Sequence, residues 1–277
     1  MKECVYQIFQ QCFPSIPIHF AAFQRKLNFD QCAIETVQEK GKNVGFSLVQ
    51  QNGILLLCVL PEYQGRGYGT QLLQKSEELV HAQGFDHVTL GSSPSGYLFQ
   101  GVPMLEFQTE HFFERFGYEA DGTSVDMAMP LEQFSLQSLE IPPCPKQVVF
   151  RLLHPEEGEK LLAAVTDAQP DWHVFFKQSN PHSVLIAEQQ GEIAGFCIVD
   201  ENGAPLCDDT TGEIGCVGVV HAARKQGIGL VMVAHATNEL KKRGCKNAFL
   251  GFTEREHWYS QIGYRTTMRF WMGEKRL

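Results

Sequence analysis

The stretch Gln64-Gly65-Arg66-Gly67-Tyr68-Gly69 decides the fold of this 277-residue chain, because it returns 160 positions later as Arg224-Lys225-Gln226-Gly227-Ile228-Gly229. Each copy stands between an apolar run typical of a buried strand and an amphipathic run with helical periodicity. Glycines at such a junction allow a tight turn and leave no Cβ in the way of a ligand. The free N–H groups at the start of the following helix suit a pyrophosphate. The sequence therefore predicts two strand–loop–helix units with the same binding chemistry.

The repeat extends beyond these two glycine loops. Further landmarks recur in the same order in both halves: Val59 and Val219, Gly84 and Gly244, Val44–Val49 and Ala194–Val199, Phe116–Tyr118 and Ile262–Tyr264. Matches in this order are the sign of an internal duplication. Helices and strands alternate in both halves, which indicates an α/β (α+β) fold built twice.

The prolines of Ile141-Pro142-Pro143-Cys144-Pro145 mark the boundary between the halves, because they stop both helices and central strands. We therefore predict an N-terminal domain over residues 1–135, a stiff linker over 136–147 and a C-terminal domain over 148–277. The C-terminal half opens on a predicted strand at Val148–Leu153. The N-terminal half opens on a predicted helix from about Glu3 to Cys12 and shows no matching first strand.

Composition excludes several classes of protein. Hydrophobic residues make up 43% and charged residues 20% of the chain, as in ordinary globular proteins. The net charge of -9 and the lack of a basic run argue against nucleic-acid binding, and acidity weakly favours a cationic acceptor. No apolar run approaches the roughly 18 residues that span a membrane, and the N-terminus does not resemble a signal peptide. Nine scattered cysteines without a Cys-x-x-Cys pair predict no zinc or other metal site and a reducing, cytoplasmic location.

The two glycine loops resemble the Arg/Gln-x-x-Gly-x-Gly/Ala loop of the GNAT superfamily of N-acetyltransferases, and the likeness extends through both halves. It implies two GNAT domains in tandem, each a mixed, mostly antiparallel twisted sheet flanked by helices. It also implies acetyl-CoA, or another acyl-CoA, as co-substrate, with the pantetheine arm paired to the strand before each loop. The cofactor-binding residues implied are Leu57, Cys58, Val59, Gln64, Gly65, Arg66, Gly67, Tyr68, Gly69 and Thr70 in the first half, and Val217, Gly218, Val219, Arg224, Lys225, Gln226, Gly227, Ile228 and Gly229 in the second.

The same resemblance suggests which half is catalytic. The family often uses a carboxylate on the strand before the loop as general base, and a tyrosine four residues before the final Gly-Tyr as acid for the leaving thiolate. Glu213 and Tyr259 hold these places in the second half, where a regular strand would put Glu213 on the same face as Val217, although a bulge would change this. The first half has Gly53 and Phe113 instead, and neither can carry a proton.

An insertion leaves catalysis by the first half open. Gly84 to Gly117 spans 33 positions, whereas Gly244 to Gly263 spans only 19. The added residues lie around Ser92–Tyr97, where the family's acceptor and thioester meet. Tyr97, Glu106 and His111 could supply replacement chemistry there, although an ordinary surface loop is the simpler interpretation.

We therefore expect an N-acyltransferase that moves an acetyl group directly from acetyl-CoA to a primary amine, with Glu213 and Tyr259 as base and acid. Two alternatives stay open: a non-catalytic protein that binds or senses acyl-CoA, and catalysis in the N-terminal domain. The acceptor is expected to be a small-molecule or peptide amine. Its identity, the acyl chain length and the choice between monomer and homodimer cannot be read from the sequence.

Overall fold

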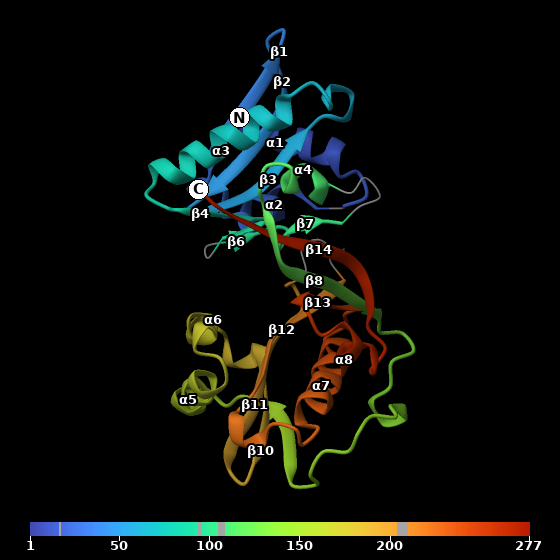
Figure 1. The fold of residues 1–277 in the computed structure, drawn as a ribbon. Helices are drawn as coiled ribbons and strands as arrows, with labels where there is room; N and C mark the ends of the chain where they lie inside the picture. The colour runs from blue at the N-terminus through green and yellow to red at the C-terminus, as the bar shows by residue number, and fades with distance from the viewer. Residues whose placement is uncertain (17, 94–95, 105–108, 204–209) are drawn as a thin grey trace. The chain divides into compact units, whose positions relative to one another are not determined.

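A computed structural model describes the chain from residue 1 to 277, apart from residues 17, 94–95, 105–108 and 204–209 (Figure 1). The described residues form two compact units. The N-terminal unit holds Met1–Val125 and Met268–Leu277, and the C-terminal unit holds residues 126–203 and 210–267. Two long strands, β8 (Glu119–Pro130) and β14 (Arg265–Arg276), therefore each contribute to both units. Within the described residues, no helix is long and apolar enough to cross a membrane.

The N-terminal unit is a sheet with helices on both faces. Its helices are α1 (Lys2–Cys12), α2 (Phe20–Lys26), α3 (Tyr68–Ala82) and α4 (Glu110–Glu114). Its strands are β1 (Ala33–Glu39), β2 (Lys42–Gln50), β3 (Gly53–Val59), β4 (His87–Leu90), β5 (Ser92–Ser93), β6 (Gly96–Tyr97) and β7 (Val102–Pro103). The main sheet runs β1-β2-β3-β4-β14, and only the β3–β4 pair is parallel among its neighbouring strands.

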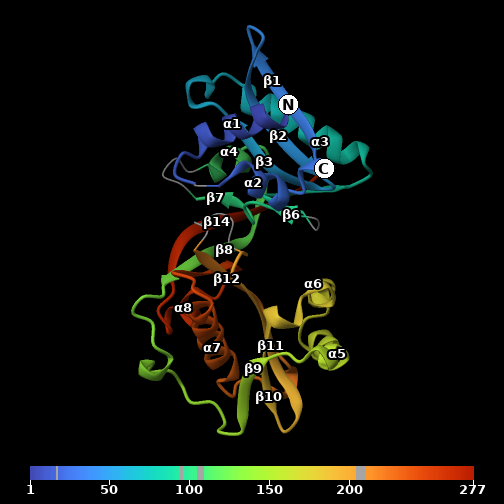
Figure 2. The ribbon, with the colours of Figure 1, turned by 180° about the vertical axis from the view of Figure 1, so that it is seen from behind.

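Helices α1 and α3 lie on opposite faces of this sheet, as Figures 1 and 2 show from the front and from behind. On the face of α1, a cluster of aromatic side chains around Phe9, Phe23 and Phe99 packs on β2 and β3. On the other face, Leu73 and Val80 of α3 pack on a second cluster. The i, i+3, i+4 spacing of the buried residues of α3 is what directs one side of the helix to the sheet.

The C-terminal unit repeats this plan. Its elements in chain order are β9 (Val148–Leu152), α5 (Gly158–Ala168), α6 (His173–Gln178), β10 (Val184–Gln189), β11 (Glu192–Asp200), β12 (Thr211–Val219), α7 (Ile228–Lys242), β13 (Asn247–Thr253) and α8 (Glu256–Ser260). Its strands run in the order β13-β12-β11-β10-β9, and only β12 and β13 are parallel. Helices α5 and α6 cover one face of the sheet and α7 covers the other (Figure 1).

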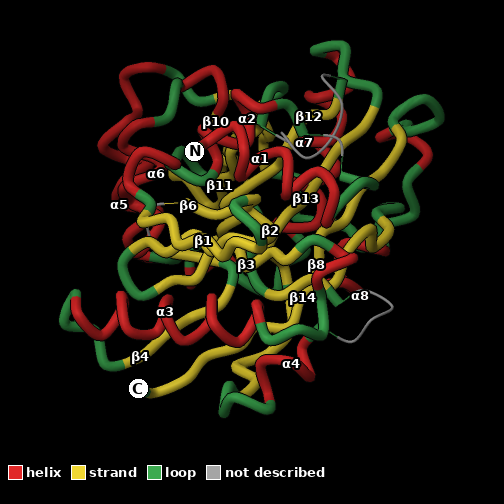
Figure 3. The backbone as a smooth tube through the Cα atoms, turned by 90° about the horizontal axis from the view of Figure 1, so that it is seen from above, coloured by secondary structure: helices red, strands yellow, loops and turns green. Residues whose placement is uncertain are grey.

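The duplication is visible in the register of the parallel strands. Gly53 of β3 pairs with Thr89 of β4, and Glu213 of β12 pairs with Phe249 of β13, which are the same positions displaced by 160. The tube view in Figure 3 shows α3 beside β3 and β4, the two strands that this helix connects. Parallel neighbours need such a crossover, and here it is the helix that begins at the glycine loop.

The fold confirms two mixed, mostly antiparallel sheets flanked by helices. In the described residues the N-terminal sheet begins at β1, so it has no counterpart of β9, which agrees with the missing first strand in the sequence. The division into residues 1–135, 136–147 and 148–277 stays a prediction from the repeat. The compact units add that the last ten residues, which include the buried Phe270 and Trp271, belong to the N-terminal unit.

Candidate active site

Each glycine loop folds into the same left-handed turn at the start of a 15-residue helix. The backbone φ angle is +72° at Gly65 and +86° at Gly67, and it is +63° at Lys225 and +78° at Gly227. Gly67 and Gly227 precede the first helical residues, and neither makes a side-chain cap to the first turn. The N–H groups of that turn are therefore available to a ligand at the positive end of the helix dipole.

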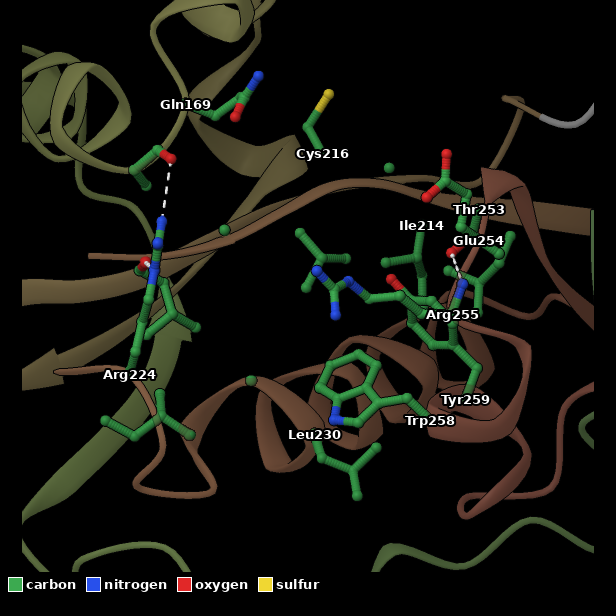
Figure 4. A pocket seen from close by; sticks show the side chains of 18 of the residues that line it. Gln169, Ile214, Cys216, Arg224, Leu230, Thr253, Glu254, Arg255, Trp258 and Tyr259 are labelled. Carbon is green, nitrogen blue, oxygen red and sulfur yellow. Dashed lines mark hydrogen bonds between the residues drawn. The ribbon is translucent and has the colours of Figure 1, made fainter. Parts of the chain in front are cut away.

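The first residue of each loop ties the loop to the strand before it. The Gln64 Nε2 atom donates to the carbonyl oxygen of Val59 at 3.0 Å, and the Arg224 Nε atom donates to that of Val219 at 3.1 Å. Arg224 also reaches the carbonyl oxygen of Ala168 at the end of α5, the bond drawn as a dashed line in Figure 4. These side chains shape the loop, so the backbone is the part left for the ligand.

The other predicted loop residues divide into exposed and packed side chains. Arg66 is exposed and lies over the Tyr63 ring at 5.2 Å, while Gln226 donates to the Ala222 carbonyl at 3.2 Å. Ile228 is buried. A Cβ at Gly229 would lie 3.2 Å from the Trp258 ring, so the ring packs closely on this glycine.

A bulge opens β12 ahead of the second loop. Phe196 of β11 pairs with Gly218, but Ile198 pairs with Gly215, so β12 has one extra residue between these pairs. The bulge includes Cys216, whose backbone φ angle is +50°. The recorded pairing of β12 with β13 ends at Glu213 and Phe249, and the six residues that follow on β12 line a cavity instead.

This cavity has a volume of about 1050 Å³ and lies entirely in the C-terminal unit. It joins β12, the second glycine loop, the end of β13 and α8. The predicted residues that line it are Val217, Gly218, Val219, Arg224, Lys225, Gly227, Ile228, Gly229 and Tyr259. Figure 4 shows Trp258 and Tyr259 on one helix, with the Trp258 ring extending toward Leu230 of α7. The volume of the cavity and the length of β12 along it suit an extended ligand such as acyl-CoA.

Tyr259 is held as a neutral phenol in the wall of this cavity. Its side chain is only 7% exposed and meets Trp258 edge to face at 4.8 Å between ring centroids. Burial raises the pKa of Tyr259 to about 12, although Arg255 and a hydrogen bond with the Thr253 side chain oppose this. The hydroxyl therefore carries its proton at neutral pH and can donate a hydrogen bond.

Glu213 lies on β12 immediately before the residues that line the cavity. Its side chain is half-buried and packs beside Gly203, where an added Cβ would lie 2.8 Å from the Glu213 Cβ. Burial raises the pKa of Cys216 to about 12, and the charge of Glu213 adds to the effect. Because the bulge lies between Glu213 and Val217, the simple alternation of a regular strand does not relate their side chains.

The corresponding positions of the N-terminal unit are closed. A Cβ at Gly53 would lie 2.4 Å from the carbonyl oxygen of Ser92 in the inserted segment. Phe113 is buried in the cluster beneath α3. The Cys12 thiol of α1 donates to the Val59 carbonyl at 3.5 Å, and Cys58 is 3% exposed. Side chains of α1 and of the insertion thus pack along the part of β3 that the sequence assigned to the pantetheine arm, Leu57–Val59.

The structure describes two of the three replacement residues considered for the N-terminal unit. Tyr97 pairs with Ser92 in a two-stranded ribbon, and His111 is exposed beside Glu114 at 3.8 Å. Glu106 lies outside the described residues.

Several lining residues had no signal in the sequence. Phe252 is 46% exposed and adopts a φ of +53°, with its N–H bonded to the buried carboxylate of Asp126 at 3.3 Å. Trp172 and Gln169 enter from the turn between α5 and α6, and Pro142 enters from the segment interpreted as a linker. A proline-rich stretch indicates only a break in regular structure, so its place against a cavity could not be inferred from the sequence.

A bulged strand, a glycine loop at a helix start and a cavity between splayed parallel strands together define an acyl-CoA-dependent transferase of the GNAT class. The sequence profile of the acetyltransferase (GNAT) family matches residues 147–264, and that of the acetyltransferase (GNAT) domain matches residues 31–120. The two matches together cover three quarters of the chain. The chain belongs to the GNAT acetyltransferases and carries two GNAT domains in tandem.

Similar proteins agree with this assignment. Mycothiol acetyltransferase of Renibacterium salmoninarum is 25% identical over 206 residues, which are 72% of this chain but only 59% of that protein. Mycothiol acetyltransferase of Amycolatopsis mediterranei is 25% identical over 76% of this chain and 72% of its own length. Among solved structures, a tandem GNAT protein from the clavulanic acid pathway has a TM-score of 0.70 at 14% identity and covers 99% of this chain and 95% of its own. The glucosamine N-acetyltransferase region of a fungal β-N-acetylglucosaminidase has a TM-score of 0.86 at 24% identity, covering 99% of this chain and 37% of that one.

Proposed function

We propose that the C-terminal unit transfers an acetyl group from acetyl-CoA directly to a primary amine. The observation that carries the proposal is that one cavity joins the second glycine loop, the bulged strand β12 and the phenol of Tyr259. The glycine loop would hold the pyrophosphate of the donor, and β12 would hold its pantetheine arm. Tyr259 would then lie beside the thioester.

The proposed reaction has two proton transfers and starts from the neutral amine of the acceptor. The nitrogen attacks the thioester carbonyl carbon and a C–N bond forms, while Glu213, directly or through a water molecule, accepts one proton from that nitrogen. The C–S bond breaks as the tetrahedral intermediate collapses. The Tyr259 hydroxyl, which its raised pKa keeps protonated at neutral pH, hydrogen-bonds the departing thiolate and passes it a proton, so that coenzyme A leaves as the free thiol. Exchange with solvent then returns the proton from Glu213 to Tyr259.

The acceptor proposed here is a small amine. The cavity opens between exposed or half-buried polar side chains such as Gln169 and Glu254, beside the apolar Phe252. Two relatives are named mycothiol acetyltransferases, so amines related to mycothiol come first among the acceptors to try. The acceptor panel should also contain amino sugars, polyamines and peptide N-termini.

The test combines acetyl-CoA binding with turnover. With an active acceptor from the panel, we expect Glu213→Gln and Tyr259→Phe each to lower kcat by about 10²- to 10⁴-fold, the usual range for losing one acid or base. The Kd for acetyl-CoA should stay within about twofold, because neither side chain is assigned to donor binding. Tyr118→Phe, which removes the hydroxyl of a buried tyrosine in the N-terminal unit, is the matched control and should retain full activity. Unchanged turnover in both active-site variants would overturn the assignment.

For the N-terminal unit we propose a non-catalytic role. Gly53 stands at the place of Glu213 with its side-chain space filled by Ser92, and Phe113 replaces Tyr259. Among the described residues, the positions equivalent to Glu213 and Tyr259 carry neither an acid nor a base, and retention of the first glycine loop there fits a structural partner better than a second enzyme. Calorimetry should then show one acetyl-CoA site for each chain. A second site that Gly67→Trp removes would favour an additional acyl-CoA-binding function instead.

A further inference from the structure

The segment Ile141–Pro145 packs directly on the second glycine loop. A Cβ added at Gly227 would lie 2.9 Å from the carbonyl oxygen of Pro143 and 3.7 Å from the Cα atom of Cys144. Pro142 is exposed and lines the cavity together with Arg224 and Lys225 of the loop. We call this segment the proline strap.

The chain that leads into the strap is bound to the last turn of helix α7. The Lys241 Nζ atom donates to the carbonyl oxygens of Glu132 and Phe134 at 3.0 and 2.7 Å. From there the chain reaches the start of α7, where Pro143 lies against Gly227. After the strap, the Val148 N–H donates to the Pro145 carbonyl at 3.1 Å, just where β9 begins.

The first glycine loop provides a comparison within the same chain. Gly67 has nearly the same backbone conformation as Gly227, but a Cβ added there would meet nothing within 4 Å in the described residues. The strap thus distinguishes the loop of the cavity-bearing unit from that of the other unit.

We propose that the proline strap is part of the donor site and contacts the nucleotide end of coenzyme A. This inference rests on the proposed function, which assigns the pyrophosphate to the second glycine loop and the pantetheine arm to Val217–Val219. A donor that runs along β12 and then crosses the loop has only its adenosine 3′-phosphate left beyond the pyrophosphate. Pro142 of the strap lines the cavity, and Pro143 lies against Gly227 of the loop.

The chemistry of the strap suits a nucleotide base. The Pro142 ring is apolar and rigid, so it can cover one face of adenine with little loss of conformational freedom. The Pro143 carbonyl oxygen can accept a hydrogen bond from the exocyclic amino group of adenine. Lys225, which also lines the cavity, supplies positive charge for phosphate.

This assignment predicts selectivity for the complete cofactor over its shortened forms. Acetyl-4′-phosphopantetheine keeps the thioester, the pantetheine arm and one phosphate but lacks adenosine. For a chain with Pro142→Ala and Pro143→Ala together, the Kd for acetyl-CoA should rise by about fivefold to tenfold, from the loss of apolar contact and stiffness. The Kd for acetyl-4′-phosphopantetheine should change by less than twofold.

Calorimetric titration of both ligands into wild type and variant measures this difference. The matched control is Pro145→Ala, which removes a proline of the same strap but leaves the carbonyl that Val148 uses. An equal loss for both ligands, or no loss for acetyl-CoA, would overturn the inference. Wild type that binds no acetyl-CoA would instead overturn the proposed function itself.

A second measurement needs no substitution, so it holds even if the double variant folds poorly. Cys144 is half-buried in the strap, and its alkylation by iodoacetamide can be followed by peptide mass spectrometry. Saturating acetyl-CoA should slow this alkylation several-fold, while saturating acetyl-4′-phosphopantetheine should leave it unchanged. Equal protection by the two ligands would show that the strap does not meet the nucleotide.

Discussion

Gln64 and Arg224 hold equivalent places in the two glycine loops and do the same structural work with different chemistry. Each donates to the carbonyl oxygen five residues earlier, which belongs to the last residue of the preceding strand. The guanidinium of Arg224 has donors to spare, and one of them reaches the Ala168 carbonyl at 3.1 Å. The arginine therefore also ties the loop to α5.

Another residue-scale effect concerns the acid stability of the C-terminal unit. Arg151 of β9 binds Glu157 at 2.7 Å and Glu188 at 2.6 Å, all three being partly buried. The hydrogen bond from Arg151, helped by the backbone N–H of His154, lowers the pKa of Glu157 to about 2. A lowered folded-state pKa means that the stabilisation is complete above the ordinary value of 4.5 and is lost as the pH falls toward 2.

We expect Glu157→Gln to lower the free energy of unfolding by about 1 kcal/mol at pH 6, as for a partly exposed charged pair. The difference from wild type should shrink by more than half at pH 3, because the wild-type carboxylate has by then lost most of its advantage. Urea unfolding at the two pH values measures both quantities. Glu159→Gln, at an exposed site on α5, should show no such pH dependence. A constant difference between pH 6 and pH 3 would contradict the assignment.

At the scale of elements, the inserted ribbon packs on β3 of the N-terminal unit at Gly53, the position equivalent to Glu213. We expect Gly53→Ala to destabilise this unit by more than about 2 kcal/mol, because the new Cβ would lie 2.4 Å from the backbone oxygen of Ser92, which cannot swing away as a side chain can. Hydrogen exchange in β3 and β4 should rise accordingly. Gly158→Ala in α5 is the control, since its Cβ would meet nothing within 4 Å and alanine favours a helix. Unchanged protection in β3 would rule the clash out.

The sequence predicted the elements built on hydrophobic periodicity and glycine. Strand, glycine loop and helix were predicted in both halves, because the loop glycines and the capped amphipathic runs are local signals. The bulge at Cys216 and the left-handed turn at Phe252 were not predicted. Positive φ angles are normally marked by glycine, and neither residue is a glycine. They are held there by tertiary contacts, such as the bond from the Phe252 N–H to Asp126. The roles of Glu213 and Tyr259 came from resemblance and stay predictions.

At the scale of the whole molecule, sequence repeats and compact units do not share their boundaries. The last ten residues complete the N-terminal unit: Arg276 pairs with His87, the Leu277 N–H donates to the Asp86 carbonyl, and Lys275 binds Glu77 at 2.9 Å. Conversely, residues 126–130 of β8 belong to the C-terminal unit. Contacts between positions this far apart in the chain cannot be inferred from periodicity, which reports only on neighbours.

The last prediction concerns fragments of the chain. A cut in the proline-rich stretch gives residues 1–135 without the strand Met268–Leu277, and residues 148–277 without Asp126. We expect the fragment of residues 1–135 not to unfold cooperatively, because the loss of Phe270 and Trp271 leaves a hole in two core clusters, and one buried aromatic alone is worth about 3–5 kcal/mol. Fusing residues 265–277 to its end through a long glycine–serine linker should restore cooperative thermal unfolding. A fused Phe270→Ala version is the matched control and should restore less. If the unfused fragment melts as cooperatively as the fused one, the C-terminal strand is not a necessary part of the N-terminal unit.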